Sequence, residues 1–409
     1  MEQLTWAPII PLIGGFSVGA EMAAKTPPVG IFSYSAFDKN DSHYVNYQNN
    51  TLKRNIPYYH LDNESTKVPK QKIDIMVATP PCAGLSQLNT GKKGTDKGSG
   101  SCAVQNEWMY KSTTDAIENF SPTVIIGENA PTLYTTMGEG VAQNLYEIAK
   151  KNNYSLALYK TTTYCHGLPQ KRLRCFYFLF KSESAPSLQF YKRDLVGTFE
   201  QYLTEIPESA TLQDYDNIIR KDIINEPYYM FLQHKFNSHD VRDIILERSF
   251  TAHSYVVKEN LMNEFVEWAE KNHQKGYELG IHAQKKFADG KGVWDGSIHV
   301  FRDHMNALIG RALAESIHPN KDRSLNIREA LHMMGLPSNF ELLGGRKNVN
   351  HIAQNVPTFT ARDMVTEAIE FINGNRELTN ENFAKFNNIK QKMDTKGVTI
   401  TNTIEEFFA

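Results

Sequence analysis

The stretch Ile73-Asp74-Ile75-Met76-Val77-Ala78-Thr79-Pro80-Pro81-Cys82-Ala83-Gly84-Leu85-Ser86 decides which fold the sequence predicts. Its apolar first half predicts a strand, and the two prolines must end that strand, because proline fixes φ and has no amide hydrogen to donate. Cys82 therefore follows the carboxyl end of the strand, the edge at which open α/β sheets bind ligands. A thiol held there is either a nucleophile or a small packed side chain, and a lone cysteine is packed by default.

Length and composition are those of an ordinary globular protein. The 409 residues are 41% hydrophobic and 22% charged, and this length suggests two domains. No run of about 18 apolar residues occurs and the first residues do not resemble a targeting segment, so we expect a cytoplasmic protein without membrane contact. The formal net charge of -2 argues against a protein that coats nucleic acid everywhere, but it leaves room for a local basic groove.

The cysteines do not suggest a metal site or a disulfide scaffold. Cys82, Cys102, Cys165 and Cys175 form no CxxC pair and have no zinc spacing. We therefore expect reduced, unpaired thiols and no bound metal.

Two earlier apolar runs end at features typical of a nucleotide-binding sheet. The first leads into the glycine turn Gly14-Gly15-Phe16 and a helix-like segment, an order that lets the backbone approach a ligand. The second ends near Phe37 and Asp38, and a third element reaches Asp62; such positions in a parallel sheet bind ribose and base. A tight structural turn and a helix cap are the alternative interpretations.

The segment after Cys82 is rich in glycine and lysine. Gly91 to Gly100 contains four glycines and the lysines Lys92, Lys93 and Lys97. This composition predicts a mobile, positively charged loop beside the thiol, with a solvated linker as the alternative.

Two further strands present charged groups. The run Thr123 to Ile126 ends in Glu128-Asn129, and Gln170-Lys171-Arg172-Leu173-Arg174 leads into an apolar strand. Alternation along a strand directs Arg172 and Arg174 to one face, and burying two guanidinium groups is costly without anionic or carbonyl partners. An exposed basic strand start is the alternative.

The strand and helix alternation fades between about Ser182 and Pro319, which predicts an inserted second domain. It resumes with a helix pattern over Leu325 to Gly335 and a last helix from about Thr360 to Ile372.

Taken together and in this order, these elements resemble the DNA cytosine-5 methyltransferase family, of the phage and bacterial single-chain type. The resemblance covers about residues 8 to 181 and 318 to 373. It rests on the glycine turn, Pro80-Pro81-Cys82 with Ser86, Glu128-Asn129, Gln170 to Arg174, Arg323 to Ala330 and Gly335-Leu336-Pro337.

The resemblance implies an α/β fold with a Rossmann-like sheet that binds S-adenosyl-L-methionine. It assigns residues 1–181 and 318–374 to the catalytic domain, 182–317 to a smaller target-recognition domain and 375–409 to a C-terminal extension. Duplex DNA is the implied partner of a monomeric enzyme, which flips the target cytosine out of the stack.

The resemblance also implies the role of each site residue. Cys82 is the nucleophile that adds to cytosine C6, Glu128 the acid at N3, Arg174 the group that holds O2, and Arg172 its support. The residues implied to bind the cofactor are Gly14, Gly15, Phe16, Phe37, Asp62, Pro80, Gln354 and Val356. Those implied to bind DNA are Ser86, Lys92, Lys93 and Lys97.

Most departures from the family pattern lie on the cofactor side. Leu12 stands in place of a glycine, Ala36 in place of a ribose-binding glutamate, Ala83 in place of a glutamine, and Ala353-Gln354 in place of Gly-Asn. The alternatives that these departures permit are transfer from a modified S-adenosylmethionine and a DNA-binding pseudoenzyme. Methylation of cytosine in tRNA is a further alternative, and a nicotinamide-dependent oxidoreductase rests on the glycine turn alone.

Overall fold

The computed structural model describes most of the chain and divides it into two compact units. The described residues are 3–37, 42–63, 68–69, 71–82, 84–86, 104–195, 199–204, 226–291, 298–308, 315–344, 350–389, 394–395 and 398–399. The first unit comprises residues 1–196, 333–343 and 354–409, and the second comprises 197–332 and 344–353. The predicted loop with Lys92, Lys93 and Lys97, together with Asp38, Ala83 and Cys102, lies outside the described residues.

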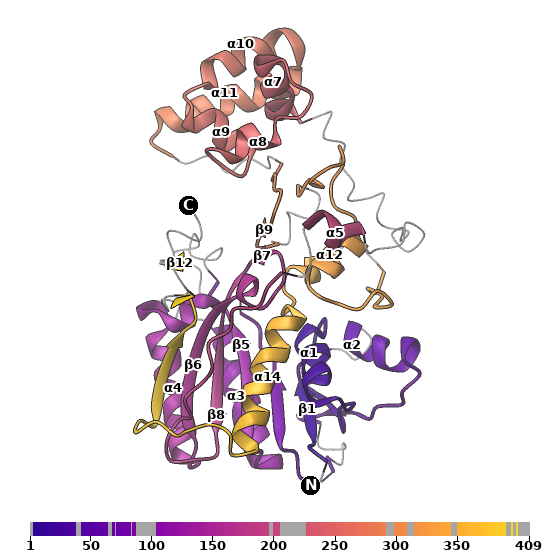
Figure 1. The fold of residues 1–409 in the computed structure, drawn as a ribbon, viewed down its shortest axis with the longest axis vertical. Coiled ribbons are helices and arrows are strands. Elements are labelled where there is room, and N and C mark those ends of the chain that lie inside the picture. Colours follow the sequence, from indigo (N-terminus) through magenta and orange to yellow (C-terminus); the bar gives the residue numbers. More distant parts are fainter. Residues whose placement is uncertain are drawn as a thin grey trace. The chain divides into compact units, whose positions relative to one another are not determined.

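Within the described residues, the first unit is built on an eight-stranded sheet of order β10-β6-β8-β5-β4-β1-β2-β3 (Figure 1). Every neighbouring pair is parallel except the two that β8 makes with β5 and β6. This mixed sheet with helices on both faces confirms the predicted α/β fold class. Its strands are β1 (Trp6–Ile9), β2 (Ile31–Ser33), β3 (Tyr58–His60), β4 (Ile75–Ala78), β5 (Val124–Asn129), β6 (Ser155–Thr162), β8 (Leu173–Phe180) and β10 (Phe383–Asn387).

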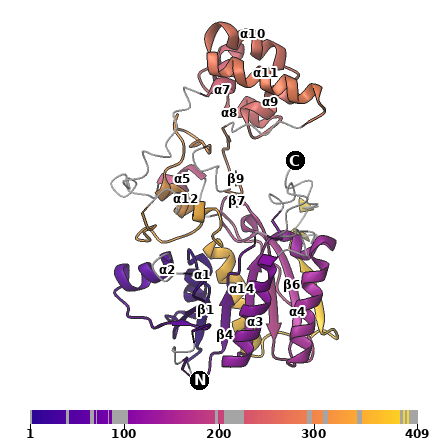
Figure 2. The same cartoon turned by 180° about the vertical axis from the view of Figure 1, so that it is seen from behind.

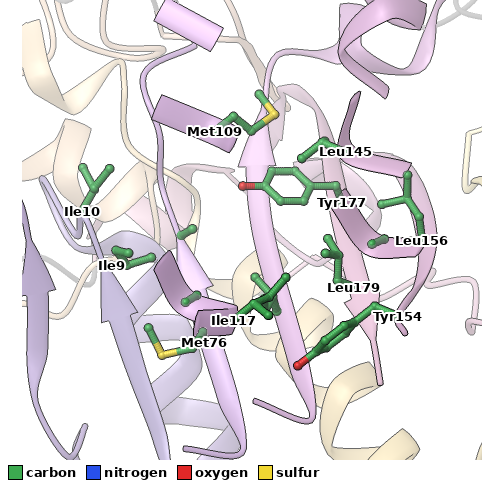
Figure 3. Close-up of a cluster of buried hydrophobic side chains, with 14 of the residues drawn as sticks. Ile9, Ile10, Met76, Met109, Ile117, Leu145, Tyr154, Leu156, Tyr177 and Leu179 are labelled. Carbon is green, nitrogen blue, oxygen red and sulfur yellow. The ribbon is translucent and has the colours of Figure 1, made fainter. Parts of the chain in front are cut away.

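Helices cover both faces of this sheet, which explains why its central strands are continuous apolar runs. The helices α1 (Gly15–Ala24) and α14 (Thr358–Ile372) lie together on one face, and α3 (Glu107–Phe120) and α4 (Glu139–Lys151) lie on the other (Figures 1 and 2). Figure 3 shows the core under α3 and α4, where Met109 and Leu145 approach Tyr177 and Leu179 of β8. The remaining short elements of this unit are α2 (His43–Asn46), the π-helical turn Tyr47–Thr51, the 3-10 turns Val104–Asn106, Pro131–Tyr134, Thr136–Gly138 and Thr163–Cys165, β7 (Gln170–Lys171), β11 (Asp394–Thr395) and β12 (Val398–Thr399).

The sheet gains one edge strand from the C-terminal segment. Residues 375–409 are expected to form an extension, but β10 pairs in parallel with β6, from Phe383 opposite Leu156 to Asn387 opposite Lys160. The five residues of β10 alternate too weakly to predict a strand from sequence. They form one because they pair with the edge of β6 that would otherwise be free.

The second unit is largely helical in its described part. The helices are α5 (Phe199–Thr204), α7 (Pro227–Phe236), α8 (Arg242–Leu246), α9 (Ala252–Lys258), α10 (Met262–Asn272), α11 (Gln274–Ala288) and α12 (Ile327–Met333), and the short strand β9 covers Met305–Asn306. Tyr228 of α7 stacks on Phe265 of α10 with ring centroids 4.2 Å apart, at the centre of its core. A reciprocal capping box begins α12, because Asn326 and Glu329 each accept the other's backbone amide at 2.9 and 2.7 Å.

Candidate active site

Cys82 follows β4 directly, as the two prolines predict. Leu85 donates its amide to the carbonyl of Cys82 at 3.1 Å, and the hydroxyl of Thr132 in turn donates to the carbonyl of Leu85. The turn that carries the thiol is therefore tied to the segment after β5. Cys82 is a free, half-buried cysteine packed at the rim of the core.

Glu128 lies on the adjacent strand. It pairs with Phe176 across β5 and β8, which directs both side chains to the face covered by α1 and α14. The two strands can pair here because residue 127 is a glycine: a Cβ on Gly127 would lie 1.9 Å from the ring of Tyr177. Consecutive residues of β5 therefore face opposite sides of the sheet: Glu128 lies on one face, and Gly127 lies against Tyr177 on the other.

The two arginines share the face of Glu128. Arg174 precedes Phe176 by two residues on β8, and its Nε lies 2.5 Å from Oε1 of Glu128. Arg172, two residues earlier still, is 2% exposed. The carboxylate of Glu128 is thus the anionic partner that buried guanidinium groups require.

The charges of Cys82, Glu128, Arg172 and Arg174 act on one another. Burial raises the pKa of the Cys82 thiol above its ordinary 9.0, and Glu128 raises it further, whereas the two arginines lower it. Burial also raises the pKa of Glu128 above 4.5, against the effect of the same arginines. Burial and the neighbouring Arg174 lower the pKa of Arg172. The structure therefore brings together all of the predicted catalytic residues.

This arrangement combines a thiol, a carboxyl group and two guanidinium groups in a poorly hydrated place. A carboxyl with a raised pKa retains its proton at higher pH and can donate a hydrogen bond. Two adjacent guanidinium groups favour the thiolate, which is the nucleophilic form of cysteine.

The predicted cofactor residues begin at the glycine turn. Gly14 has a φ of 104°, which residues with a side chain rarely adopt, and it immediately precedes α1. Gly15 donates its amide to Oδ1 of Asn355 at 2.8 Å, and a Cβ on Gly15 would lie 2.0 Å from the carbonyl oxygen of Val356. The first helix and the segment before α14 therefore meet without a gap.

Two buried polar atoms at this junction have no hydrogen-bond partner among the described residues. They are Oγ of Ser17, in the first turn of α1, and Nδ2 of Asn355. A buried polar atom without a partner is costly, and a bound polar group would satisfy it. Ser17 and Asn355 are therefore the residues beside the glycine turn whose polar atoms a ligand would satisfy, and each neighbours a predicted cofactor residue without being one.

Asp62 and Phe37 lie in the loops after β3 and β2. Asp62 accepts the amide of Ser35 at 2.9 Å and its hydroxyl at 2.5 Å, and these bonds outweigh partial burial to hold the pKa of Asp62 below 3.8. Phe37 packs edge-on against Trp108 of α3 with centroids 4.9 Å apart. Both residues keep exposed surface, so both remain accessible to a ligand.

The other predicted cofactor and DNA residues differ in access. Phe16 is buried with its ring against Phe176 at 5.7 Å, so it supports the sheet beside Glu128. Pro80 is buried, whereas Gln354 is exposed and Ser86 is half-buried.

Leu12, which stands where the resemblance implies a glycine, has a backbone conformation that glycine favours. Its φ is 47°, and Ile10 in the same turn has a φ of 55°. Such values are costly for branched side chains, so the turn between β1 and α1 holds local strain that glycine would relieve.

The family model for C-5 cytosine-specific DNA methylases matches residues 9–370. The chain belongs to this family. The family assignment confirms the predicted resemblance and the predicted enzyme class, a DNA cytosine methyltransferase.

Two curated relatives support the same assignment for this C-5 cytosine methylase. The type II methyltransferase M.Bpa9945I of Bacillus paralicheniformis is 22% identical over 74% of this chain and 71% of its own. The type II methyltransferase M.NgoPII of Neisseria gonorrhoeae is 24% identical over 42% of this chain and 46% of its own.

Solved structures share the fold of this C-5 cytosine methylase. The Entamoeba histolytica methyltransferase EhMeth has a TM-score of 0.52 at 12% identity and covers 91% of this chain and 99% of its own. A prophage-encoded Escherichia coli protein described as a DNA modification methyltransferase has a TM-score of 0.50 at 15% identity, over 90% and 99% of the two chains.

None of the helices in the described part of the methylase has the length and apolar character needed to cross a membrane.

Proposed function

We propose that this enzyme transfers a methyl group from S-adenosyl-L-methionine to C5 of a cytosine in duplex DNA, through a covalent bond between Cys82 Sγ and cytosine C6. The observation that carries the proposal is the proximity of Cys82 to the Glu128–Arg174 pair. Family membership supports the reaction, and this cluster supports the assignment of its steps to residues.

Cytosine C5 is a poor nucleophile, so the chain must activate the ring first. The thiolate of Cys82 adds to C6, and the electron pair of the C5–C6 bond becomes available at C5. Sulfur suits this step because its anion is the most nucleophilic side-chain group near neutral pH. After C5 has accepted the methyl group, it loses its proton and the thiolate leaves C6, which restores the aromatic ring and the free cysteine.

Glu128 and the arginines lower the barrier to the addition. Adding sulfur at C6 pushes electron density toward N3, where a protonated Glu128 supplies a hydrogen bond or proton; such acid catalysis contributes about 10² to 10⁴ in rate. Arg174 holds the cytosine O2 and favours the thiolate, and Arg172 supports both from the same face.

The cofactor supplies the methyl group when it is bound. We propose that Gly14 and Gly15 approach it through their backbone, that Phe37 stacks on its adenine, and that Asp62 accepts its amino group. Ser17 and Asn355 each offer a buried polar atom that has no partner among the described residues. We propose that Phe16, Pro80, Gln354 and Val356 also line the cofactor site.

The same reaction requires a change in the DNA. The cytosine must leave the stack before C6 can meet a thiol, at a cost of a few kcal/mol. We propose that Ser86 and the lysines Lys92, Lys93 and Lys97 contact the DNA backbone, and that the second unit selects the target sequence. Because the curated relatives are type II methyltransferases, we propose that the enzyme serves as the modification partner of a restriction system.

The test uses the full chain, unmodified duplex DNA and S-adenosylmethionine, with nucleosides analysed by mass spectrometry. We expect 5-methylcytosine from the wild type and none from Cys82→Ser, with Cys165→Ser as the matched control that keeps activity. A duplex with 5-fluorocytosine at the target should form a covalent adduct that Cys82→Ser abolishes. A wild type that binds DNA without making product or adduct would identify a pseudoenzyme, and another modified nucleoside would indicate a different donor.

A further inference from the structure

The C-terminal strand β10 pairs with β6, the strand next to the one that carries Arg174, although β10 lies beyond the residues matched by the family model. That match ends at residue 370, and β10 begins at Phe383. Asn388, the first residue after β10, is 1% exposed and continues the pairing with β6 by donating its amide to the carbonyl of Lys160 at 2.9 Å. A buried asparagine at the end of an edge strand needs several partners, because its side chain has two donor hydrogens and an acceptor.

Every hydrogen-bonding group of the Asn388 side chain has a partner within the first unit. Its Oδ1 accepts the amide of Tyr191 at 2.9 Å, and its Nδ2 donates to the carbonyl of Tyr191 at 3.1 Å and to Oγ1 of Thr161 at 3.0 Å. These bonds also fix which end of the amide is oxygen, since only the carbonyl end can accept from the amide of Tyr191. Asn388 therefore joins the end of β6 to the segment around Tyr191.

A buried chain of hydrogen bonds continues from Thr161 to α14. Oγ1 of Thr161 lies 2.8 Å from Nε2 of His166, and Nδ1 of His166 lies 2.8 Å from Oδ2 of Asp363. Burial lowers the pKa of His166, which favours the neutral ring. Because the carboxylate of Asp363 can only accept, the proton of the neutral ring lies on Nδ1, and Nε2 accepts the hydroxyl of Thr161.

A hydroxyl, an imidazole and a carboxylate in this order also occur in nucleophilic triads, but Thr161, His166 and Asp363 are all 0% exposed. No substrate reaches a hydroxyl in that position, so the chain of bonds orients the protein itself. The oxygen of Asp363 that faces His166, Oδ2, also accepts from Nε of Arg193 at 2.7 Å, and Oδ1 lies 3.0 Å from Nε of Arg362.

The network ends at the backbone of Arg172. Thr163, two residues beyond Thr161, donates its amide to the carbonyl of Arg172 at 3.0 Å and its hydroxyl at 3.3 Å. His166 begins the turn that returns the chain to Arg172, and Arg193 donates its amide to the carbonyl of Cys165 at 2.9 Å. The turn before Arg174 is therefore held at both ends, at the carbonyl of Cys165 by Arg193 and at the carbonyl of Arg172 by Thr163. Asn388 and His166 fix the residues next to these two contacts.

We propose that Asn388 and His166 are positioning residues for the methyl transfer, through which the C-terminal strand β10 sets the placement of Arg172 and Arg174 beside Cys82. The proposal rests on the proposed function for its kinetic consequence. Its structural consequence, the ordering of residues 163–174, does not depend on any activity.

The test compares Asn388→Ala and Asn388→Asp with Asn382→Ala in the full chain. Asn388→Asp keeps the shape and the acceptor but loses both donor hydrogens. Asn382 is a matched control, an exposed asparagine just before β10 whose Oδ1 accepts one surface hydrogen bond from Tyr146. Steady-state kinetics with duplex DNA and S-adenosylmethionine are combined with hydrogen exchange of the peptide that covers residues 163–174.

We expect both Asn388 variants to lower kcat by about 10- to 100-fold, since a small misplacement of catalytic groups has effects of this size. The KM for S-adenosylmethionine should stay within about twofold, because Asn388 does not contact the glycine turn, and exchange of the Thr163 amide should accelerate about tenfold or more. Asn382→Ala should leave all of these unchanged.

Wild-type kcat in both Asn388 variants would overturn the proposal, as would unchanged exchange over residues 163–174. A loss of kcat that Asn382→Ala reproduces would also overturn it, because general loosening of β10 would then explain the result. If the wild type itself makes no methylcytosine, the proposed function fails, and the exchange measurement still decides the positioning role.

Discussion

The guanidinium of Arg174 and the carboxylate of Glu128 form an ion pair across two antiparallel strands, with Nε 2.5 Å from Oε1. Their side chains are only 15% and 5% exposed, so water screens the pair weakly. Removing one partner of such a pair leaves an uncompensated charge in a poorly hydrated place. The pair therefore couples the stability of the sheet to the chemistry at its edge.

Replacing Arg174 should reduce both activity and stability. In Arg174→Ala the proposed charged hydrogen bond to the cytosine O2 is lost, which should lower kcat/KM roughly 10- to 100-fold, while the free energy of unfolding falls by about 1–3 kcal/mol. Methylation kinetics and urea unfolding measure the two effects. Arg54→Ala breaks the Arg54–Glu21 pair elsewhere in the first unit and serves as the control. Full activity in Arg174→Ala would contradict the assigned role.

Glu128 and Cys82 should give the enzyme a characteristic pH dependence. The proposed reactive form has Cys82 deprotonated and Glu128 protonated. The pKa of Cys82 is raised above 9.0 and that of Glu128 above 4.5, so the group that must lose its proton has the higher pKa. As pH rises, kcat/KM should therefore increase up to the pKa of Glu128, stay level, and fall above the pKa of Cys82.

The Glu128→Gln variant separates the two groups. Its rate should be about 10² to 10⁴ lower and should rise without a plateau up to the pKa of Cys82, because no acid remains to be lost. Glu118→Gln, at an exposed position of α3, is the matched control. A plateau that persists in Glu128→Gln would assign the acid to another residue.

Gly15→Ala should separate α1 from the segment before α14. The new Cβ would lie 2.0 Å from the carbonyl of Val356 and 2.4 Å from Oδ1 of Asn355, so the backbone must move. We expect a loss of about 1–3 kcal/mol in the free energy of unfolding, measured in urea, together with weaker binding of S-adenosylmethionine. Gly344→Ala meets nothing within 4 Å among the described residues and should change neither. Wild-type stability in Gly15→Ala would show that this junction relaxes freely.

Trp108 should report cofactor binding by its fluorescence. Its ring contacts Phe37, which we propose stacks on adenine, and it is half-exposed. Titration with S-adenosylmethionine should change the tryptophan emission of the wild type. Trp108→Phe should remove most of this change, whereas Trp268→Phe, in the second unit, should retain it. The opposite pattern would place the adenine away from Phe37.

Acid should destabilise the first unit in part through His166. Burial lowers its pKa below 6.5, so between the two values the unfolded chain binds a proton that the folded protein does not. Stability therefore decreases as pH falls from 7 to 5, by up to about 1.4 kcal/mol per pH unit for one proton. Urea unfolding of His166→Gln should show a shallower dependence, and His239→Gln, at an exposed position, should match the wild type. Equal slopes in wild type and His166→Gln would refute this assignment.

Local sequence patterns predicted the parts of this fold that depend on neighbouring residues. Prolines after β4 required that strand to end before Cys82, and alternation along β8 required Arg172 and Arg174 to share a face. The loss of alternation in the middle of the chain predicted a second unit, although not that its described part is helical.

The strand ends and the residue types at them follow from the local sequence, because proline, alternation and helical spacing act over a few residues. Which of those ends face each other follows from the three-dimensional fold. It placed Arg174 against Glu128, left Leu12 in a glycine conformation, and joined Asn388 to Thr161 and His166. Each of these relationships depends on the order of strands in the sheet, which no local pattern specifies.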